Sequence, residues 1–192
     1  QLRQINLNKK MIILEPEGRN TAPAVAISSL IAAEEGKDPL ILVLSADHKV
    51  SDENKFKKTI KEAFEYAEDG RIVTFGVIPS HPESGFGYIE SKKIMSNKNN
   101  SSQIKRFIEK PDISLAQKIF NNQKFTWNSG IFLFKASVML KELNRYEPEL
   151  IKLCKKAIKG RRDDLDFTRI NEEFFKKCPN LPIDIAVMEK TD

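Results

Sequence analysis

The sequence predicts an α/β fold, a Rossmann-like mixed, mainly parallel sheet with helices on both faces. Short apolar segments of strand length alternate with longer segments whose apolar residues recur at helical spacing, and this alternation is typical of such sheets. The continuous apolar run from Leu40 to Leu44 suits a central strand that is buried on both faces. The 192 residues are enough for one domain with a real core, without a visible repeat or linker.

Six segments are expected to form strands. Met11 to Leu14 is a short apolar strand, followed by the turn-forming residues 15–18. Residues 104–108 alternate between apolar and basic side chains, which favours a half-exposed strand, whereas the aromatic residues of 127–134 indicate a buried one. The expected strands are 11–14, 40–44, 72–78, 88–90, 104–108 and 127–134.

Helices are expected between these strands. Thr21 can cap a helix that begins near Pro23, because proline fits the first helical turn. Its continuation, Ala24 to Ala33, is rich in small residues, which let a helix approach a sheet closely. Ser51 or Asp52 is expected to cap the next helix, in which apolar residues from 56 to 67 recur at helical spacing. The remaining expected helices are 114–121, 137–146, 149–159 and 168–177.

Composition argues against two classes of partner. The formal net charge is +5, but the lysines alternate with acids, as in Lys61-Glu62, and this pattern is typical of a solvated helix face rather than of a nucleic-acid surface. No apolar run approaches the roughly 20 residues of a membrane span, and no signal peptide is visible. The two cysteines, Cys154 and Cys178, predict buried free thiols rather than a disulfide framework. We therefore expect a cytoplasmic protein without a nucleic-acid or membrane partner.

Polar residues follow or precede several of the expected strands. These positions matter because ligand sites in α/β proteins lie in crevices at strand ends. Each polar segment carries a group suited to a sugar phosphate: an acid for a metal ion, glycines for close approach, a cation for phosphate and an amide for hydroxyls. The segments are Ser45-Ala46-Asp47-His48, Gly85-Phe86-Gly87-Tyr88, Phe107-Ile108-Glu109-Lys110-Pro111 and Asn128-Ser129-Gly130.

Each candidate residue also has a simpler interpretation. Asp47 could hold a magnesium ion, which favours one or two carboxylates plus phosphate oxygens, or could only cap the following turn. His48 could act as a base, although a satisfied structural histidine is the favoured interpretation. Lys110 presents a point charge to a phosphate, and Glu109 could accept hydrogen bonds from sugar hydroxyls, but an isolated Glu-Lys pair is usually surface decoration. Asn128 lies among aromatic residues, so its amide must find partners in the backbone or in a ligand.

Two further features concern backbone groups. Gly85 and Gly87 would let the backbone come close to a ligand, or would form an ordinary turn. Arg19-Asn20-Thr21 leads into a helix N-terminus, where N–H groups and the helix dipole favour anions. Plain capping explains Thr21 without any ligand.

Taken together, these segments resemble the mannose-1-phosphate guanylyltransferases of the bacterial kind, within the sugar nucleotidyltransferases. The resemblance covers nearly the whole chain, and the order of the segments also fits. The Gly-Arg-Asn-Thr-Ala-Pro segment points to the mannose and guanine branch. The segments that carry the resemblance are 13–23, 44–48, 85–89, 107–111, 127–132 and Ile183-Asp184-Ile185-Ala186-Val187-Met188-Glu189-Lys190.

The resemblance implies that GTP and mannose 1-phosphate give GDP-mannose and pyrophosphate, as in polysaccharide biosynthesis. Catalysis is then mainly positioning and charge neutralisation. By this resemblance Asp47 would hold Mg²⁺ and Lys110 would bind the sugar phosphate, as the catalytic residues. Contacts to mannose would come from Gly87, Glu109 and Asn128, and the nucleotide would lie near Arg19 and Asn20. A homo-oligomer is possible.

The chain departs from the family pattern at its ends. The family opens with a Gly-rich loop that wraps the triphosphate, whereas Gln1-Leu2-Arg3 resembles sequence downstream of that loop. A second metal-binding aspartate is expected just beyond Asp192. We therefore expect residues 1–192 to be a fragment of the nucleotidyltransferase domain, with doubtful activity of its own and an exposed apolar sheet edge beside strand 11–14. The alternatives are a nucleotidyltransferase for another hexose 1-phosphate and a non-catalytic sugar-nucleotide-binding module.

Overall fold

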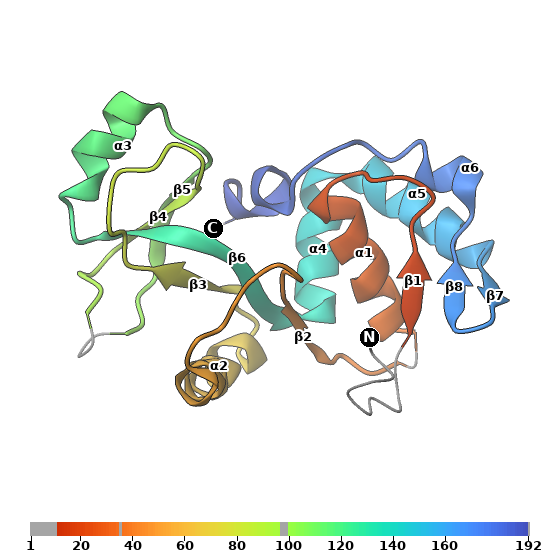
Figure 1. Ribbon diagram of the computed structural model, residues 1–192. Coiled ribbons are helices and arrows are strands. Elements are labelled where there is room, and N and C mark those ends of the chain that lie inside the picture. Colours follow the sequence, from red (N-terminus) through yellow and green to blue (C-terminus); the bar gives the residue numbers. More distant parts are fainter. Residues whose placement is uncertain (1–10, 35, 97–99, 192) are drawn as a thin grey trace.

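The computed structural model describes residues 11–34, 36–96 and 100–191. The expectation that the Gly-rich loop is missing rests on Gln1 to Arg3, and these residues lie outside the described range. Two sheets and the helices around them make up the described chain (Figure 1). The class of mixed α/β protein is therefore as the sequence predicts.

The larger sheet has five strands and is organised by β6 (Phe125–Lys135). On one edge, β6 pairs with β4 (Tyr88–Ser91) and further along with β2 (Leu40–Val43). On its other edge it pairs with β3 (Val73–Val77), and β5 (Ile104–Ile108) extends the sheet beyond β4. With 11 residues, β6 is thus long enough to pair with three other strands.

The prediction of mainly parallel strand pairing is wrong for this sheet. Every neighbouring pair within it is antiparallel. The reason is the position of β6, because β2 and β3 run in the same direction but lie on opposite edges of this oppositely directed strand. In the part of the chain that the structure describes, the one parallel pair is β1 with β8.

A bulge interrupts β6 in its middle. Thr74 of β3 lies opposite Phe132, but Gly76 lies opposite Asn128, so that Phe75 alone faces residues 129–131. The backbone of Gly130 has φ +70, a left-handed conformation that glycine adopts without steric cost. On the other edge, pairing with β4 ends at Trp127 and pairing with β2 begins at Phe132. The bulged residues therefore lie between two strand ends.

The smaller sheet pairs the first described strand with two strands from the C-terminal part of the chain. β1 (Ile12–Leu14) pairs in parallel with β8 (Phe167–Arg169), and β7 (Arg162–Asp164) pairs with β8. The predicted helix over 168–177 is wrong in its first half, because Thr168 and Arg169 take part in the strand. Asn171 caps the short α6 (Glu172–Phe175) by accepting a hydrogen bond from the Phe174 N–H at 3.2 Å.

Helices cover both faces of the larger sheet. On one face α1 (Thr21–Ala32), α4 (Ala136–Tyr146) and α5 (Pro148–Lys159) pack with the five-residue turn η2 (Asp184–Met188) around the main core. On the other face α2 (Glu53–Glu68) packs over Leu133. α3 (Ile113–Phe120) packs against Tyr88 and Phe125.

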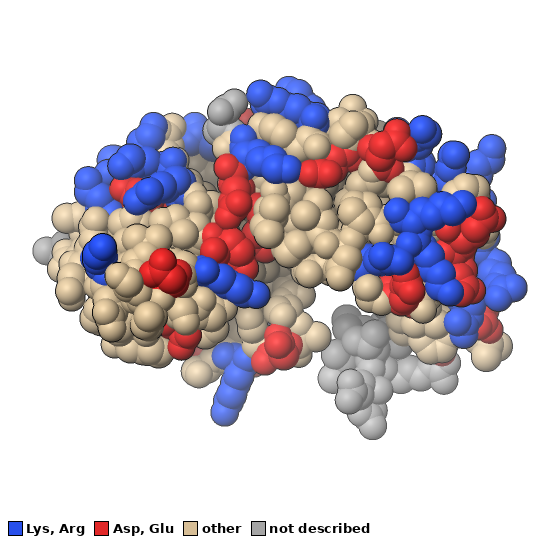
Figure 2. Space-filling view, turned by 90° about the horizontal axis from the view of Figure 1, so that it is seen from above, with Lys and Arg blue, Asp and Glu red and all other residues tan. Residues whose placement is uncertain are grey.

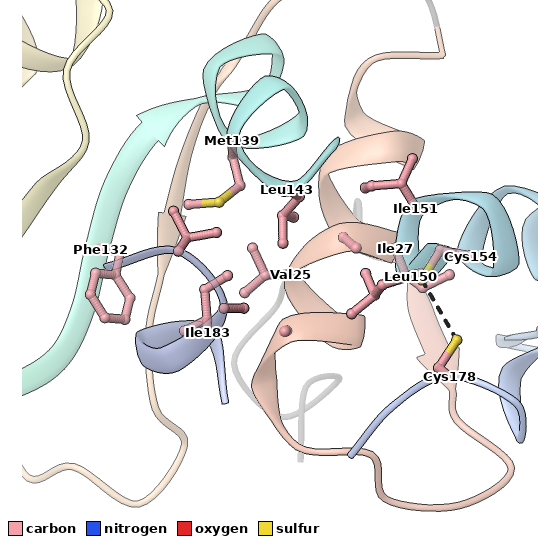
Figure 3. Close-up of a cluster of buried hydrophobic side chains, with 14 of the residues drawn as sticks. Val25, Ile27, Phe132, Met139, Leu143, Leu150, Ile151, Cys154, Cys178 and Ile183 are labelled. Atoms are coloured by element: carbon pink, nitrogen blue, oxygen red, sulfur yellow. Dashed lines mark hydrogen bonds between the residues drawn. The ribbon is translucent and has the colours of Figure 1, made fainter. Parts of the chain in front are cut away.

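The main core places large side chains under the site described below (Figure 3). Val25 of α1, Phe132 of β6 and Ile183 before η2 point toward one another and are almost fully buried. Fully burying a side chain of this size contributes roughly 1.5–3 kcal/mol. Cys154 and Cys178 are buried free thiols, as predicted, with their Sγ atoms 3.9 Å apart.

Two local expectations need correction. Asn20, not Thr21, is the N-cap of α1, and its side chain accepts a hydrogen bond from the Thr21 N–H at 3.0 Å. Strand 11–14 pairs with β8, so it does not lack a neighbour, but its other edge is unpaired among the described residues, as expected. In the same residues β2 pairs with β6 alone, so strand 40–44 lies at an edge of its sheet and is half-buried, rather than central and buried on both faces as predicted. Among these residues, no helix is long and apolar enough to cross a membrane.

We predict that the 192-residue chain self-associates through the open edge of β2. The four residues of β2 are apolar and half-buried, and the edge of β2 away from β6 pairs with no strand among residues 11–34, 36–96 and 100–191. Such an edge is a template for another strand. Sedimentation velocity over a range of concentrations should show growing oligomers. A monodisperse monomer with a sharp, reversible thermal transition would contradict this prediction.

Candidate functional site

A cavity of about 300 Å³ opens at the bulge of β6. It lies where β2 ends, β4 begins and β5 ends, and it is closed from the side of α1 and η2. Acidic side chains form a band between the two halves of the molecule on the face seen in Figure 2. The lining residues are Thr21, Val25, Val43, Leu44, Ser45, His48, Gly85, Phe86, Gly87, Glu109, Lys110, Asn128, Ser129, Gly130, Phe132, Ile183 and Asp184.

Asn128 is the most firmly held of the predicted residues. Its Oδ1 accepts hydrogen bonds from the Gly130 N–H at 3.1 Å and from Thr74 Oγ1 at 3.3 Å. Its Nδ2 donates to Asp184 Oδ1 at 2.9 Å. These three contacts fix the plane of the amide, and they also settle which of its ends is the donor. The need for buried partners, expected from the sequence, is met within the protein.

Glu109 and Lys110 leave the end of β5 and enter the cavity together. The Glu109 carboxylate is 20% exposed and lies 3.7 Å from Lys110 Nζ, whereas the Lys110 side chain is 66% exposed. Burial raises the pKa of Glu109, and the nearby carboxylates of Asp184 and Glu189 act in the same direction. Glu109 and Lys110 therefore both form part of the cavity wall. The exposed ammonium group of Lys110 can bind an anionic group of a ligand.

Glu109 lies close against the backbone of Gly87. A Cβ atom at position 87 would lie 2.7 Å from Glu109 Oε2 and 3.5 Å from Asn128 Cβ. The Gly87 carbonyl accepts a hydrogen bond from the Asn128 N–H at 2.8 Å, which continues the β4–β6 ladder by one step. The group that lies close to this glycine is the Glu109 side chain, and the close approach of a ligand stays a prediction.

Asp184 is a site residue that the sequence did not single out. It begins η2, lines the cavity and accepts the hydrogen bond from Asn128. Burial raises the pKa of Asp184, with a smaller contribution from Glu189. The available signal was an aspartate inside an otherwise apolar stretch, Ile183 to Met188, because a buried carboxylate there requires a partner.

Asp47 and His48 lie on the exposed loop after β2. Asp47 does not line the cavity, although Ser45 and His48 on either side of it do. The Ser45 hydroxyl donates to Asp47 Oδ1 at 2.5 Å, and this hydrogen bond lowers the pKa of the carboxyl. The expectation that His48 is a satisfied structural histidine is not met, since the residue is exposed at the cavity wall.

Arg19 and Asn20 lie outside the cavity wall. The Arg19 guanidinium donates to the Lys176 carbonyl and pairs with Glu17, so it holds the start of α1 against the segment that follows α6. Asn20 caps α1 with a left-handed backbone at φ 64. Of the segment Arg19-Asn20-Thr21, Thr21 alone lines the cavity. The Thr21 Oγ1 atom accepts a hydrogen bond from the Ile183 N–H at 2.8 Å.

A metal ion would have to be held by few protein ligands. Across residues 11–34, 36–96 and 100–191, no group of three or more His, Cys, Asp and Glu side chains is arranged to hold one. Asp47 is exposed and its carboxylate form is favoured. Such a residue fits the magnesium pattern, in which one or two carboxylates are completed by water and phosphate oxygens.

The described chain is thus a mixed α/β protein with a cavity at its strand ends that carries both charged and apolar side chains. The chain belongs to the nucleotidyl transferase family, whose family model matches residues 1–173. It is 48% identical to mannose-1-phosphate guanylyltransferase RfbM of Salmonella typhimurium and 44% identical to the xanthan biosynthesis protein XanB of Xanthomonas campestris, in each case over all of this chain and 40% of that protein. The chain thus spans about two fifths of these curated relatives.

The fold is also similar to a solved structure. A crystal structure described as mannose-6-phosphate isomerase from Helicobacter pylori matches with a TM-score of 0.88 and 33% sequence identity. The match covers 99% of this chain and 73% of that one. The mixed α/β architecture expected from the sequence is therefore confirmed.

We predict that Gly87→Ala displaces Glu109 and weakens the binding of a sugar phosphate. The added methyl group would overlap Glu109 Oε2, and losing one hydrogen bond to a charged group corresponds to roughly tenfold or more in affinity. Calorimetric titration with mannose 1-phosphate measures the effect. Gly18→Ala is the control, because a Cβ at position 18 meets nothing within 4 Å. Equal affinities in the two variants would contradict the assigned close approach.

We predict that Glu109→Gln changes how stability depends on pH. The folded-state pKa of Glu109 is raised above its ordinary value of 4.5, so the folded protein retains a proton that the unfolded chain releases. The wild type should lose stability relative to the variant as pH rises from about 4.5 through the raised pKa. Urea unfolding between pH 4 and 8 measures the difference. Glu173→Gln is the control, with the opposite sign, because Lys177 lowers the pKa of Glu173.

Proposed function

We propose that the protein containing this chain transfers GMP from GTP to mannose 1-phosphate, giving GDP-mannose and pyrophosphate. The observation that carries the proposal is one cavity that combines the Lys110 cation, the Glu109 carboxylate and the fixed amide of Asn128. A cation suits the phosphate, and the carboxylate and amide suit sugar hydroxyls. The names of the curated relatives RfbM and XanB support the same reaction and a place in polysaccharide biosynthesis.

The proposed reaction relies on positioning and charge. An oxygen of the sugar phosphate attacks the α-phosphorus of GTP in line, and pyrophosphate leaves. We assign Lys110 to neutralise the sugar phosphate, which is the role of a point charge on a flexible stem. Gly87, Glu109 and Asn128 would hold the mannose. Holding two reactants in attack geometry contributes a large part of such a rate enhancement.

The nucleotide is assigned to the side of the cavity formed by α1. Thr21 lines the cavity there, and the N-terminus of a helix favours phosphate. We propose that Arg19 and Asn20 serve this side by fixing the start of α1. Arg19 does so through the Lys176 carbonyl, and Asn20 does so as the cap.

Family members typically use a divalent metal ion, and we propose Mg²⁺ with Asp47 as its protein ligand. When bound, the ion would neutralise phosphate charge. Asp47 would contribute one carboxylate oxygen, while Ser45 holds the carboxylate by its hydrogen bond. The cytoplasm, where GTP and sugar phosphates are available, is the proposed compartment.

We propose that residues 1–192 are a part of the nucleotidyltransferase domain. The support is that the chain spans 40% of RfbM and of XanB. Kinetic tests therefore use the full-length gene product. The alternatives are a different hexose 1-phosphate as substrate and a module that only binds sugar nucleotides.

A second candidate reaction is favoured by the Helicobacter pylori structure, which is described as mannose-6-phosphate isomerase. Both reactions require recognition of a mannose phosphate. The two are separated by giving the full-length gene product GTP with mannose 1-phosphate, or mannose 6-phosphate alone. GDP-mannose in the first mixture supports the transferase, and isomerised hexose phosphate in the second supports the isomerase.

We predict that Lys110→Ala lowers the apparent affinity for mannose 1-phosphate about ten- to a hundredfold, since a hydrogen bond to a charged group contributes about 1.5–3 kcal/mol. The KM for GTP should change little. Steady-state kinetics of the full-length gene product test this. If the KM for GTP rises as much as that for the sugar phosphate, Lys110 does not serve the sugar side.

We predict that Asp47→Asn, which keeps the shape but removes the charge, strongly lowers kcat at fixed magnesium. Binding of mannose 1-phosphate should be less affected, because Asp47 does not line the cavity. Activity measured against magnesium concentration provides the readout. A variant with most of its activity would reduce Asp47 to a residue that caps a turn.

A further inference from the structure

The turn η2 connects the two parts of the cavity that carry the proposed sugar contacts. At its beginning, Asp184 accepts the hydrogen bond from Asn128 Nδ2, which belongs to β6. At its end, Glu189 Oε1 accepts a hydrogen bond at 3.1 Å from the backbone N–H of Glu109, which follows β5. A single short segment therefore holds both the Asn128 amide and the backbone of Glu109.

This segment is itself fixed on both sides. The Ile183 N–H donates to Thr21 Oγ1 at 2.8 Å, and the Leu181 carbonyl accepts from the Ala22 N–H at 3.0 Å. After the turn, the Tyr146 hydroxyl donates to the Lys190 carbonyl at 2.7 Å. Its apolar residues, Ala186, Val187 and Met188, are buried in the main core. Asp184 is thus carried on a rigid support rather than on a loose loop.

We propose that Asp184 is a positioning and specificity-determining residue for the sugar phosphate, acting through the Asn128 amide and as a hydroxyl acceptor at the cavity wall. The proposal rests on the proposed function for its substrate class. With one N–H directed to Asp184 and the amide oxygen occupied by Gly130 and Thr74, Asn128 offers its second N–H to a ligand. Asp184 therefore determines how the remaining N–H group of Asn128 is oriented toward the sugar.

The two carboxylates of the cavity have different parts in this arrangement. Glu109 lies beside Lys110, at 3.7 Å from its Nζ, and so would accept from the sugar hydroxyls nearest the phosphate. Asp184 is joined to Asn128 and lies beside Ile183 on the core side of the cavity. A sugar phosphate seated with its phosphate on Lys110 would place hydroxyls toward Asp184. Loss of Asp184 should therefore affect the sugar and not the phosphate.

The test compares Asp184→Asn and Asp184→Ala in the full-length gene product. Asparagine retains an oxygen that can accept from Asn128, whereas alanine removes it. Calorimetric titration gives dissociation constants for mannose 1-phosphate, glucose 1-phosphate and inorganic phosphate. We expect the affinity for mannose 1-phosphate to fall about tenfold or more in the alanine variant and less in the asparagine variant. The preference for mannose over glucose should shrink, while phosphate binding is kept.

Two controls make the result decisive. Asp69→Asn removes a charge from the exposed end of α2, away from the cavity, and should leave all three constants unchanged. The side-chain amide resonances of Asn128 should shift in both Asp184 variants and not in Asp69→Asn. These resonances report the contact between Asn128 and Asp184 without requiring turnover.

Each outcome bears on the proposal. Unchanged sugar-phosphate affinity, an equal loss for inorganic phosphate, or a wild type that binds no sugar phosphate would each overturn it. A selective loss supports it whether or not the wild type makes GDP-mannose. GDP-mannose formation is measured separately, so a protein that binds mannose 1-phosphate without turnover would refute the proposed reaction and leave the role of Asp184 standing.

Discussion

The change of partners along β6 is the constraint on which the site depends. One edge of this strand pairs with β4 up to Trp127 and with β2 from Phe132 onward. The residues between them bulge, which the left-handed backbone of Gly130 allows without steric cost. Two strand ends and a bulge therefore meet at one place. Their polar groups face a cavity, whose floor is Val25, Phe132 and Ile183 of the core.

Burial of carboxylates is the cost of this arrangement. The pKa values of Glu109 and Asp184 are both raised, chiefly by burial, which means that the ionised forms are less stable there than in water. The hydrogen bond from Asn128 and the proximity of Lys110 offset part of this cost. Charged groups retained at such a cost are typical of functional sites. A ligand with hydroxyl groups would satisfy the same oxygens.

Local patterns in the sequence predicted most of the elements but not their pairing. The apolar run at Leu40 to Leu44 and the aromatic run of β6 predicted two strands of the larger sheet correctly. The predicted central position of strand 40–44 is wrong, because β2 is a half-buried strand at the edge of the sheet. Periodicity carries no information on which strand lies between two others, so it does not predict the antiparallel pairing. The predicted helix over 168–177 overlaps β8 because the partner strand β1 lies far away along the chain, where no local pattern reveals it. The role of Asp184 is hidden in the same way, since its partner Asn128 is 56 residues away.

The central claim is that the cavity at the bulge of β6 binds mannose 1-phosphate, and a nuclear magnetic resonance titration tests it most directly. The full-length gene product, labelled with ¹⁵N, is titrated with mannose 1-phosphate. The account predicts shifts of the backbone amides of Gly87 and Gly130 and of the Asn128 side-chain amide. Shifts confined to the second cavity, beside Glu34 and Arg161, or no shifts at all, would contradict it.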